Sequence, residues 1–243
     1  MVIPADITLL EPTNSSLPEE QRHFLIYIPW DEKYLEKVPE EFREFLVAVL
    51  PFLRARTTDV HTAISMSNLD VLLAKFSEAV NRRVVALALI LHDSGWSQMT
   101  EEEIAHSLGV TGLELTETAL APKEKHAIES EKIAREVLAN YAFDLPLTNE
   151  EIELICKAVR YHDKPEVVAG AEVPMPIEVQ LLVDLDHLWS FTHENFWQDT
   201  VRKGVEAAEY LKNLERDLDT YFVTEAGKQK ARELLADRAA EVR

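Results

Sequence analysis

The stretch VVALALILHDSG, residues 84–95, decides the fold of this protein. Eight apolar residues, Val84–Leu91, are followed directly by His92 and Asp93 and then by a Ser-Gly pair. Such a run predicts a buried helix that stops at the Ser-Gly pair. Burying an imidazole and a carboxylate without partners costs several kcal/mol. We therefore expect a hydrogen-bond network, a proton relay or a metal ion to compensate His92 and Asp93.

The composition of the whole chain predicts an all-α protein. The 243 residues are 47% hydrophobic, which is ample for a core, and include only six glycines. Ala, Leu, Glu, Lys and Arg favour helix, and no alternation of apolar and polar residues is long enough to predict a sheet. This length suits one large domain or one domain with appendages.

The segments around residues 84–95 predict further helices. Residues 1–38 are expected to form an irregular lead-in, in which the patch FLIYIPW (24–30) is a short strand or an extended segment. Capping boxes are expected at Thr100 and Thr148, and Pro51 should interrupt the helix that contains it. Helices are expected at 39–55, from Thr58 or Asp59 to Phe76, at 82–92, from 100, at 123–140, from 148 to an end near VRYHDKP (159–165), at 177–191 and twice within 198–243, with a loop at 109–122.

Charge and cysteine content limit the classes of partner. The formal charge is −19, from 44 acidic and 25 basic residues. Such a surface repels polyphosphate chains, so we expect no nucleic acid polymer as a partner, although a bound metal ion could still attract a small anion. Cys156 is the single cysteine and suits a reducing compartment. The sequence shows no signal peptide and no apolar run of about 20 residues, so we expect a cytoplasmic protein without membrane contact.

Histidines and aspartates interrupt or end several of the predicted apolar helices. In a helical bundle, inward-facing side chains from several helices can converge and bind a metal. Imidazole and carboxylate together suit Mn, Fe, Co, Ni or Zn, and carboxylates also admit Mg. Each residue alone is more often a hydrogen-bonded core residue or part of a solvated helix end, so it is the set that predicts a site. Its members are His61, His92, Asp93, His126, His162, Asp163, Asp184 and Asp186.

The order of these residues resembles the HD-domain superfamily of metal-dependent phosphohydrolases. His61, the pair His92-Asp93 and a later aspartate follow its H…HD…D signature. ALILHDSG resembles the apolar helix that ends in HD-x-G. KHAIESEKIAREVL and EIELICKAVRYHDKP resemble two intermediate helices on which many members carry further histidines. The resemblance covers roughly residues 57–195 and implies an HD-domain helical bundle, with the irregular lead-in before it and amphipathic C-terminal helices after it.

The resemblance implies a set of ligands for a first metal ion. His61, His92, Asp93 and one aspartate of VDLDHL would hold it. Asp184 and Asp186 lie about 200° apart on a helix, so both cannot point inward. Members often write this motif as D-x-D-x-L with the second aspartate as ligand, and Asp186 is therefore preferred.

Two further histidines are expected at the same site. His126 and His162 would either complete a second metal site bridged by Asp93 or contact the substrate phosphate, and we favour the second metal site. One or two divalent ions per chain are expected. Asp93 would then orient the attacking water, and His126 or His162 would stabilise the transition-state charge or protonate the leaving oxygen. Phosphate contacts, or else an ordinary solvated surface, are expected from Lys125, Lys157, Arg160 and Lys164.

The function that the resemblance implies is hydrolysis of a small phosphate ester or nucleotide. An HD-fold di-iron oxygenase and a non-catalytic signalling or scaffold module are the alternatives. Trp96 stands where the oxygenases carry a substrate-contacting lysine. Non-catalytic modules usually lose metal ligands, whereas this chain keeps the full set. The HHE…GYP pattern of cyclic-dinucleotide phosphodiesterases is missing.

Three parts of the chain follow from this comparison. We expect an N-terminal extension and leading helix at 1–56, the HD domain at 57–195 and a C-terminal helical extension at 196–243. The amphipathic helices of the extension would pack on the domain or form a homodimer.

Overall fold

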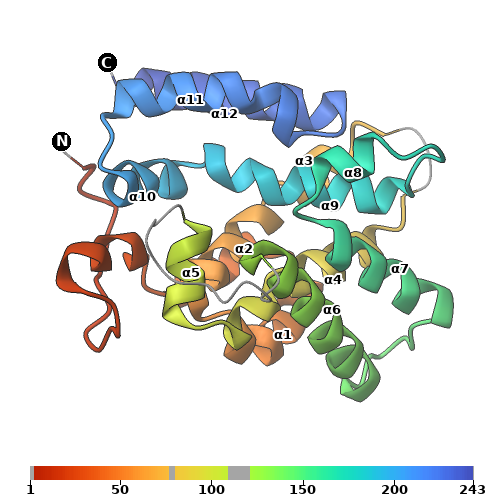
Figure 1. The fold of residues 1–243 in the computed structure, drawn as a ribbon. Helices are drawn as coiled ribbons and strands as arrows, with labels where there is room; N and C mark the ends of the chain where they lie inside the picture. Colours follow the sequence, from red (N-terminus) through yellow and green to blue (C-terminus); the bar gives the residue numbers. More distant parts are fainter. Residues whose placement is uncertain (1–2, 77–79, 109–120, 243) are drawn as a thin grey trace.

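A computed structural model of the protein describes residues 3–76, 80–108 and 121–242, which form an all-α fold (Figure 1). The expected fold class is thereby confirmed. The only extended pairing within these ranges is an isolated β-bridge between Leu10 and Tyr27. The α-helices are α1 (Glu40–Val49), α2 (Thr58–Met66), α3 (Leu69–Leu73), α4 (Arg82–Leu91), α5 (Glu101–Ser107), α6 (Pro122–Asn140), α7 (Asn149–Tyr161), α8 (Pro165–Ala169), α9 (Ile177–Leu188), α10 (His193–Lys203), α11 (Ala207–Tyr221) and α12 (Glu225–Glu241).

Helix α4 lies at the centre of the bundle because it is apolar on every side. Its residues from Val84 to Leu91 are at most 1% exposed. It contacts α1, α2, α6, α7 and α9, as an entirely apolar helix must in order to bury its whole surface. The end of α4 therefore carries His92 and Asp93 into the interior, as the sequence predicted.

Helices α11 and α12 lie side by side and cover α9 (Figure 1). Their apolar faces, with Leu214 of α11, join a core cluster that also contains Phe42 of α1, Leu87 of α4 and Ile155 of α7. The core thus runs through all three parts into which the sequence was divided. The division itself stays a prediction.

The C-terminal region contains three helices where we expected two. Helix α10 ends at Gly204, whose φ of 60° lies in the left-handed region that glycine adopts at little cost. Helix α11 begins at Ala207. The first of the two helices expected within 198–243 is therefore divided between α10 and α11, because the helical spacing of apolar residues continues in the sequence across this break in the backbone.

The start of α2 also differs from the prediction. Neither Thr58 nor Asp59 caps it; Thr57 occupies the N-cap position with a φ of 70° and no capping side-chain bond. The hydroxyl of Thr58 donates instead to the carbonyl of Leu53. The single helix expected here is divided into α2 and α3, which are separated by residues 67–68.

Other local predictions are confirmed. Thr100 with Glu103 and Thr148 with Glu151 form complete capping boxes at the starts of α5 and α7. A 3-10 helix that contains Pro51 follows α1. The patch at 24–30 is the end of a 3-10 helix followed by extended chain. Most of the loop expected at 109–122 lies outside the described residues.

No helix in the described part of the chain has the length and apolar character needed to cross a membrane.

Candidate metal centre

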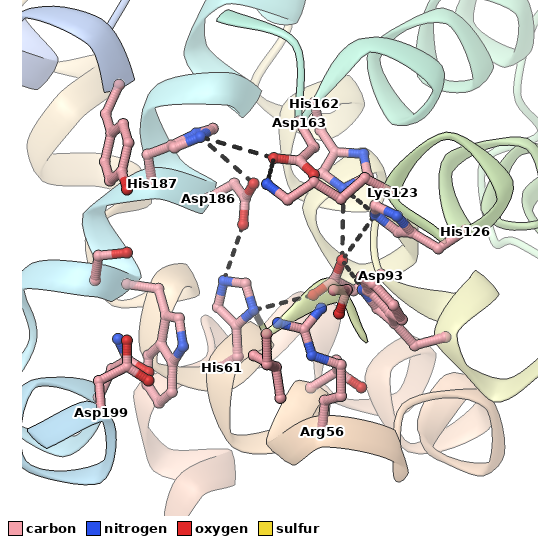
Figure 2. A pocket seen from close by; sticks show the side chains of 18 of the residues that line it. Arg56, His61, Asp93, Lys123, His126, His162, Asp163, Asp186, His187 and Asp199 are labelled. Carbon is pink, nitrogen blue, oxygen red and sulfur yellow. Dashed lines mark hydrogen bonds and ion pairs between the residues drawn. The ribbon is translucent and has the colours of Figure 1, made fainter. Parts of the chain in front are cut away.

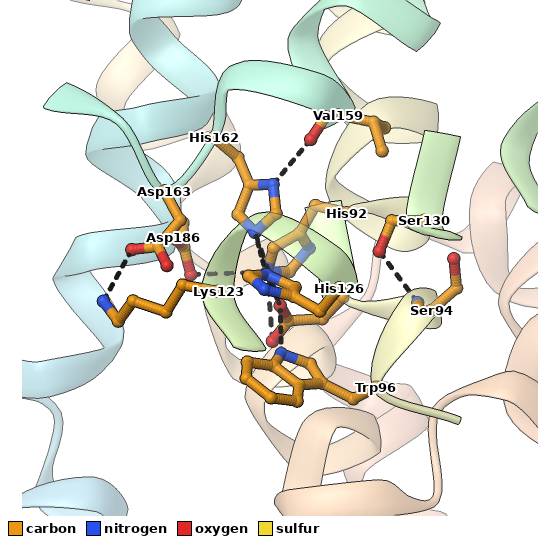
Figure 3. Close-up of polar contacts among 12 residues, drawn as sticks. His92, Ser94, Trp96, Lys123, His126, Ser130, Val159, His162, Asp163 and Asp186 are labelled. Carbon is orange, nitrogen blue, oxygen red and sulfur yellow. Dashed lines mark hydrogen bonds and ion pairs between the residues drawn. The ribbon is translucent and has the colours of Figure 1, made fainter. Parts of the chain in front are cut away.

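Five helices bring the six predicted metal ligands together at one interior point (Figure 2, and Figure 3 for His92). His61 lies within α2, His126 in the first turns of α6, and Asp186 near the end of α9. The remaining members directly follow helices: His92 and Asp93 after α4, and His162 after α7. The donor atoms form two groups, each within 4.8 Å, composed of His61, His92 and Asp186, and of Asp93, His126 and His162.

The first group contains two buried histidine nitrogens that face a carboxylate. Asp186 Oδ1 lies 3.2 Å from His61 Nε2 and 3.3 Å from His92 Nε2. Both nitrogens are buried and have no hydrogen-bond partner among the described residues. Buried polar atoms without partners are rare in proteins. Their convergence on one carboxylate oxygen is the arrangement that a bound cation would satisfy.

The second group places two imidazoles against Asp93. The Nε2 atoms of His126 and His162 lie 3.1 Å apart. They lie 3.6 and 3.4 Å, respectively, from Asp93 Oδ1. Two imidazole lone pairs approach this closely only with a proton or a cation between them.

Asp93 lies between the two groups and faces both. Its Oδ2 atom is 3.2 Å from His61 Nδ1 and 3.6 Å from His92 Nε2, whereas its Oδ1 atom faces His126 and His162. One carboxylate with its two oxygens directed to different donor groups is suited to bridge two ions.

Backbone carbonyls select the tautomers of two of these histidines. His92 Nδ1–H donates to the carbonyl of Leu89 at 2.7 Å. His162 Nδ1–H donates to the carbonyl of Val159 at 2.6 Å (Figure 3). Each bond leaves the lone pair of a neutral ring on Nε2, the atom that faces the carboxylates. Metal-binding histidines are oriented by such a bond on the opposite ring nitrogen.

The electrostatics show how the centre is balanced without an ion. Burial disfavours the charged form of His61, but the adjacent carboxylates of Asp186 and Asp93 outweigh it and raise its pKa to about 9. Burial also lowers the pKa of His162, but the nearby carboxylates of Asp93, Asp186 and Asp163 outweigh this effect and raise the pKa to about 9. Burial and the neighbouring His162 lower the pKa of His126 to about 3. The carboxylates of this centre thus favour a positive charge beside His61 and His162.

Trp96 and Gly95 fix the position of the second group. Trp96 Nε1–H donates to Asp93 Oδ1 at 3.0 Å (Figure 3). The indole also stacks on the ring of His126, with centroids 4.2 Å apart. A Cβ at Gly95 would lie 2.1 Å from the carbonyl oxygen of His126, and Gly95 N–H donates to the hydroxyl of Ser130. Only glycine therefore permits the segment after α4 to pack directly on α6.

The two aspartates of VDLDHL have different environments. Asp186 belongs to the first donor group, as preferred from the resemblance. Asp184 points away from it and accepts hydrogen bonds from the backbone N–H of Val223 and from the hydroxyl of Thr224. Burial raises the pKa of Asp184 to about 6, although these bonds oppose the rise.

The six donors fit one or two divalent transition-metal ions. Four neutral imidazoles and two carboxylates supply the nitrogen and oxygen ligands that Mn, Fe, Co, Ni and Zn accept. The unpartnered nitrogens of His61 and His92 and the close pair His126–His162 are the structural features that support this fit. The fit does not select one metal.

A cavity of about 430 Å³ lies over the two groups (Figure 2). Carboxylates and basic side chains balance in its lining, so divalent ions would give it a net positive charge. The cavity would then attract an anion. The charged Asp, Lys and Arg residues among the described lining are Asp93, Asp163, Asp186, Asp199, Arg56, Lys123, Arg202 and Lys203.

The four basic residues expected either to contact phosphate or to form an ordinary solvated surface do not line this cavity, which favours the second alternative. Lys125 forms an ion pair with Glu103 at 2.5 Å, and Arg160 and Lys164 both pair with Glu124. The fourth, Lys157, is exposed on α7. Short-range pairing with acidic neighbours on nearby helices orients these side chains.

Other basic residues take their place in the lining, and three of them already have partners. Lys123 pairs with Asp163 at 3.0 Å, and Lys203 pairs with Asp199 at 2.8 Å. Arg202 Nε donates to the carbonyl of Ile26. The fourth is Arg56, whose buried Nε has no hydrogen-bond partner among the described residues.

Sequence reasoning also missed His187 in the cavity. Its Nδ1 lies 3.8 Å from Asp186 Oδ2, and its Nε2 lies 4.0 Å from Asp163 Oδ1. The only sequence signal was its place directly after Asp186. Arg56 had no such signal, because its position depends on a local left-handed backbone.

A family model described as HD domain matches residues 62–189, slightly more than half of the chain. The matched range begins directly after His61 and contains the other five predicted ligands. No curated protein and no solved structure matches the chain.

Proposed function

This chain belongs to the HD-domain family, and from that membership we propose that it is a metal-dependent phosphohydrolase that acts on a small phosphate ester or nucleotide. One observation carries the proposal: two groups of His and Asp donors lie beneath a cavity of about 430 Å³, and Asp93 of the second group also faces His61 and His92 of the first. Ions held there would lower the pKa of bound water toward neutrality and offset the charge of a phosphoryl group.

The first group and Asp93 have the clearest roles. His61, His92 and Asp186 would hold the first ion, because their donor atoms converge and two of the nitrogens have no other partner. Asp93 would bridge to the second group and orient the attacking water. Trp96 N–H holds Asp93 Oδ1 in place for this task.

His126 and His162 have one of two roles, which the number of ions decides. With two ions per chain, both imidazoles are ligands. With one ion, they are free to contact a phosphoryl oxygen or to protonate the leaving oxygen. Their Nε2 atoms lie 3.1 Å apart and both face Asp93 Oδ1, which supports the arrangement with two ions, because one cation could bind both imidazoles and this carboxylate oxygen.

The two alternatives differ from this proposal in measurable ways. A di-iron oxygenase of the same fold would bind two irons and consume oxygen. A non-catalytic module would need none of the donors, so the complete and buried donor set favours an enzyme. Trp96 at the position after HD-x-G is a further difference from the oxygenases.

The test is metal content per chain, measured by elemental analysis on protein purified without chelator. Wild type is compared with Asp93→Ala and with Asp163→Asn, a control that removes a cavity carboxylate outside both donor groups. We expect one or two transition-metal ions in wild type and in Asp163→Asn, and loss in a folded Asp93→Ala variant. Release of phosphate from a panel of phosphomonoesters and nucleotides should follow metal content.

Three outcomes would contradict the proposed function. Wild type that binds no Mn, Fe or Zn after reconstitution is not a metal-dependent hydrolase. Two irons with oxygen consumption and no phosphate release would identify the oxygenase. A metal-loaded chain that releases no phosphate from any ester of the panel would favour the non-catalytic module.

A further inference from the structure

Arg56 reaches the cavity from an unusual backbone conformation. Arg56 and Thr57 have φ values of 55° and 70°, and no other non-glycine residue among those described has a positive φ. Left-handed backbone is unfavourable for such residues and persists only where the surroundings enforce it. Here the hydroxyl of Thr57 accepts hydrogen bonds from the backbone N–H of Ile28 and from the side chain of Gln198. The fold thus holds Arg56 in a conformation that local preference disfavours.

The guanidinium of Arg56 is fixed beside the metal centre by Trp96. Its Cζ atom lies 4.0 Å from the centroid of the Trp96 ring, a cation–π contact. Trp96 in turn donates its N–H to Asp93 and stacks on His126. Figure 2 shows the guanidinium extending into the cavity toward Asp93. The indole of Trp96 therefore contacts both the guanidinium of Arg56 and the carboxylate of Asp93.

Arg56 is also the cation of the lining that lacks a partner within the described chain. Lys123, Arg202 and Lys203 are each bonded to a carboxylate or a carbonyl. Arg56 Nε is buried without a hydrogen-bond partner, and nearby carboxylates act on the guanidinium only through longer-range attraction. A planar fork of donors left without acceptors, at a cavity built for cations, matches an oxyanion ligand.

We propose that Arg56 binds a phosphoryl oxygen of the substrate and thereby selects phosphomonoesters over phosphodiesters. This inference rests on the proposed function and specifies its substrate class. The cavity offers three positions that attract oxyanion oxygens: the two donor groups, once they hold ions, and Arg56. A phosphomonoester carries three non-bridging oxygens, whereas a diester carries two. A diester would leave one of these positions without an oxyanion partner, which is unfavourable for a buried charge.

The test is binding of two unreactive probes, inorganic phosphate and dimethyl phosphate, to Mn²⁺-loaded protein by isothermal titration calorimetry. Wild type is compared with Arg56→Gln, Arg56→Lys and Arg54→Gln. Arg54→Gln is the control, because it removes one positive charge from the same segment. Arg54 is exposed and does not line this cavity. Metal content is measured on every sample, and binding is measured well below each variant's unfolding temperature.

We expect Arg56→Gln to weaken phosphate binding by about 10- to 100-fold, the loss of charge-assisted hydrogen bonds. Arg56→Lys should fall between it and wild type, because lysine keeps the charge without the planar fork. Arg54→Gln should change binding less than about twofold, because an exposed charge is screened. Dimethyl phosphate should bind wild type more weakly than phosphate and lose less in Arg56→Gln. Metal content should be the same in all four proteins.

Three binding results would overturn the role of Arg56. They are equal phosphate affinity in wild type and Arg56→Gln, no phosphate binding by metal-loaded wild type, or an equal loss of affinity for both probes in Arg56→Gln. A loss of bound metal in Arg56→Gln would also overturn it, since Arg56 would then only support the metal centre. The proposed function fails separately. A chain that hydrolyses no ester, yet loses phosphate affinity in Arg56→Gln, refutes hydrolysis and retains Arg56 as the anion-binding residue.

Discussion

Asp184 and Asp186 lie two residues apart on α9, and their carboxylates serve different parts of the molecule. Asp186 Oδ1 lies 3.2 Å from His61 Nε2 in the first donor group. Asp184 Oδ1 accepts the backbone N–H of Val223 at 2.7 Å, directly before α12. One face of α9 thus contributes to the metal centre, and the other anchors the C-terminal helices.

The first prediction separates these two roles. Asp186→Asn should abolish or strongly weaken binding at the first metal position while the fold is retained. Asp184→Ala should lower the free energy of unfolding by about 1–3 kcal/mol, because it leaves the N–H groups of half-buried Val223 and buried Thr224 without an acceptor. Elemental analysis and urea unfolding monitored by circular dichroism measure the two effects. Loss of metal from a folded Asp184→Ala variant would contradict the assignment.

A second prediction concerns the hydrogen bond from Trp96 to Asp93. Trp96→Phe retains an aromatic ring against His126 and Arg56 but removes the N–H that holds Asp93 Oδ1. We expect affinity for the second ion to fall by about 10- to 100-fold, as for other groups that orient metal ligands. Competition with a metal indicator dye measures it. The control is Trp30→Phe, which should leave metal affinity unchanged. Trp30 packs near Tyr34 and does not line the cavity.

The third prediction tests the close approach at Gly95. Gly95→Ala places a methyl group 2.1 Å from the carbonyl of His126, so the segment after α4 must move away from α6. We expect a loss of stability of about 1–3 kcal/mol, typical of overpacking, together with weaker binding of the second ion. Ser130→Ala removes the hydrogen bond to Gly95 without adding volume. It should destabilise the fold but affect metal binding less; equal effects of both variants on metal binding would contradict the steric explanation.

The fourth prediction concerns the reactivity of the Cys156 thiol at pH 8 in native and in denatured protein. Burial raises the pKa of the Cys156 thiol to about 11, although nearby Arg135 opposes the rise. The raised pKa keeps the thiol protonated at pH 8, and Cys156 is fully buried. We expect reaction with a disulfide reagent at pH 8 to be slow in native protein and fast in denaturant. Rapid labelling of the native protein would show that α7 opens locally.

Sequence patterns that act over short distances predicted much of the fold. The apolar run of α4 identified the central helix, because every side of it must avoid water. The capping boxes of α5 and α7 were found because the two partners of each box lie only three residues apart in the sequence. The C-terminal helices were predicted less well, since the break at Gly204 leaves the apolar period undisturbed.

The candidate site was predicted where residues follow an ordered motif. His61, His92, Asp93, His126, His162 and Asp186 were named from type and order, and the structure brings all six together. Their roles as ligands stay predictions until metal is measured. The sequence left the role of the four basic residues open, because the partner of a long charged side chain depends on which acidic groups other helices bring near it.

The sequence by itself determined that the chain is helical, that α4 is its centre, and that histidines and aspartates end or interrupt apolar helices. These properties follow from local spacing, capping and solubility. Tertiary structure alone decided that Asp93 lies between two donor groups, that Asp184 turns away from them, and that Arg56 reaches the same cavity. These are long-range relationships, since they arise only when helix ends from distant parts of the chain pack around α4.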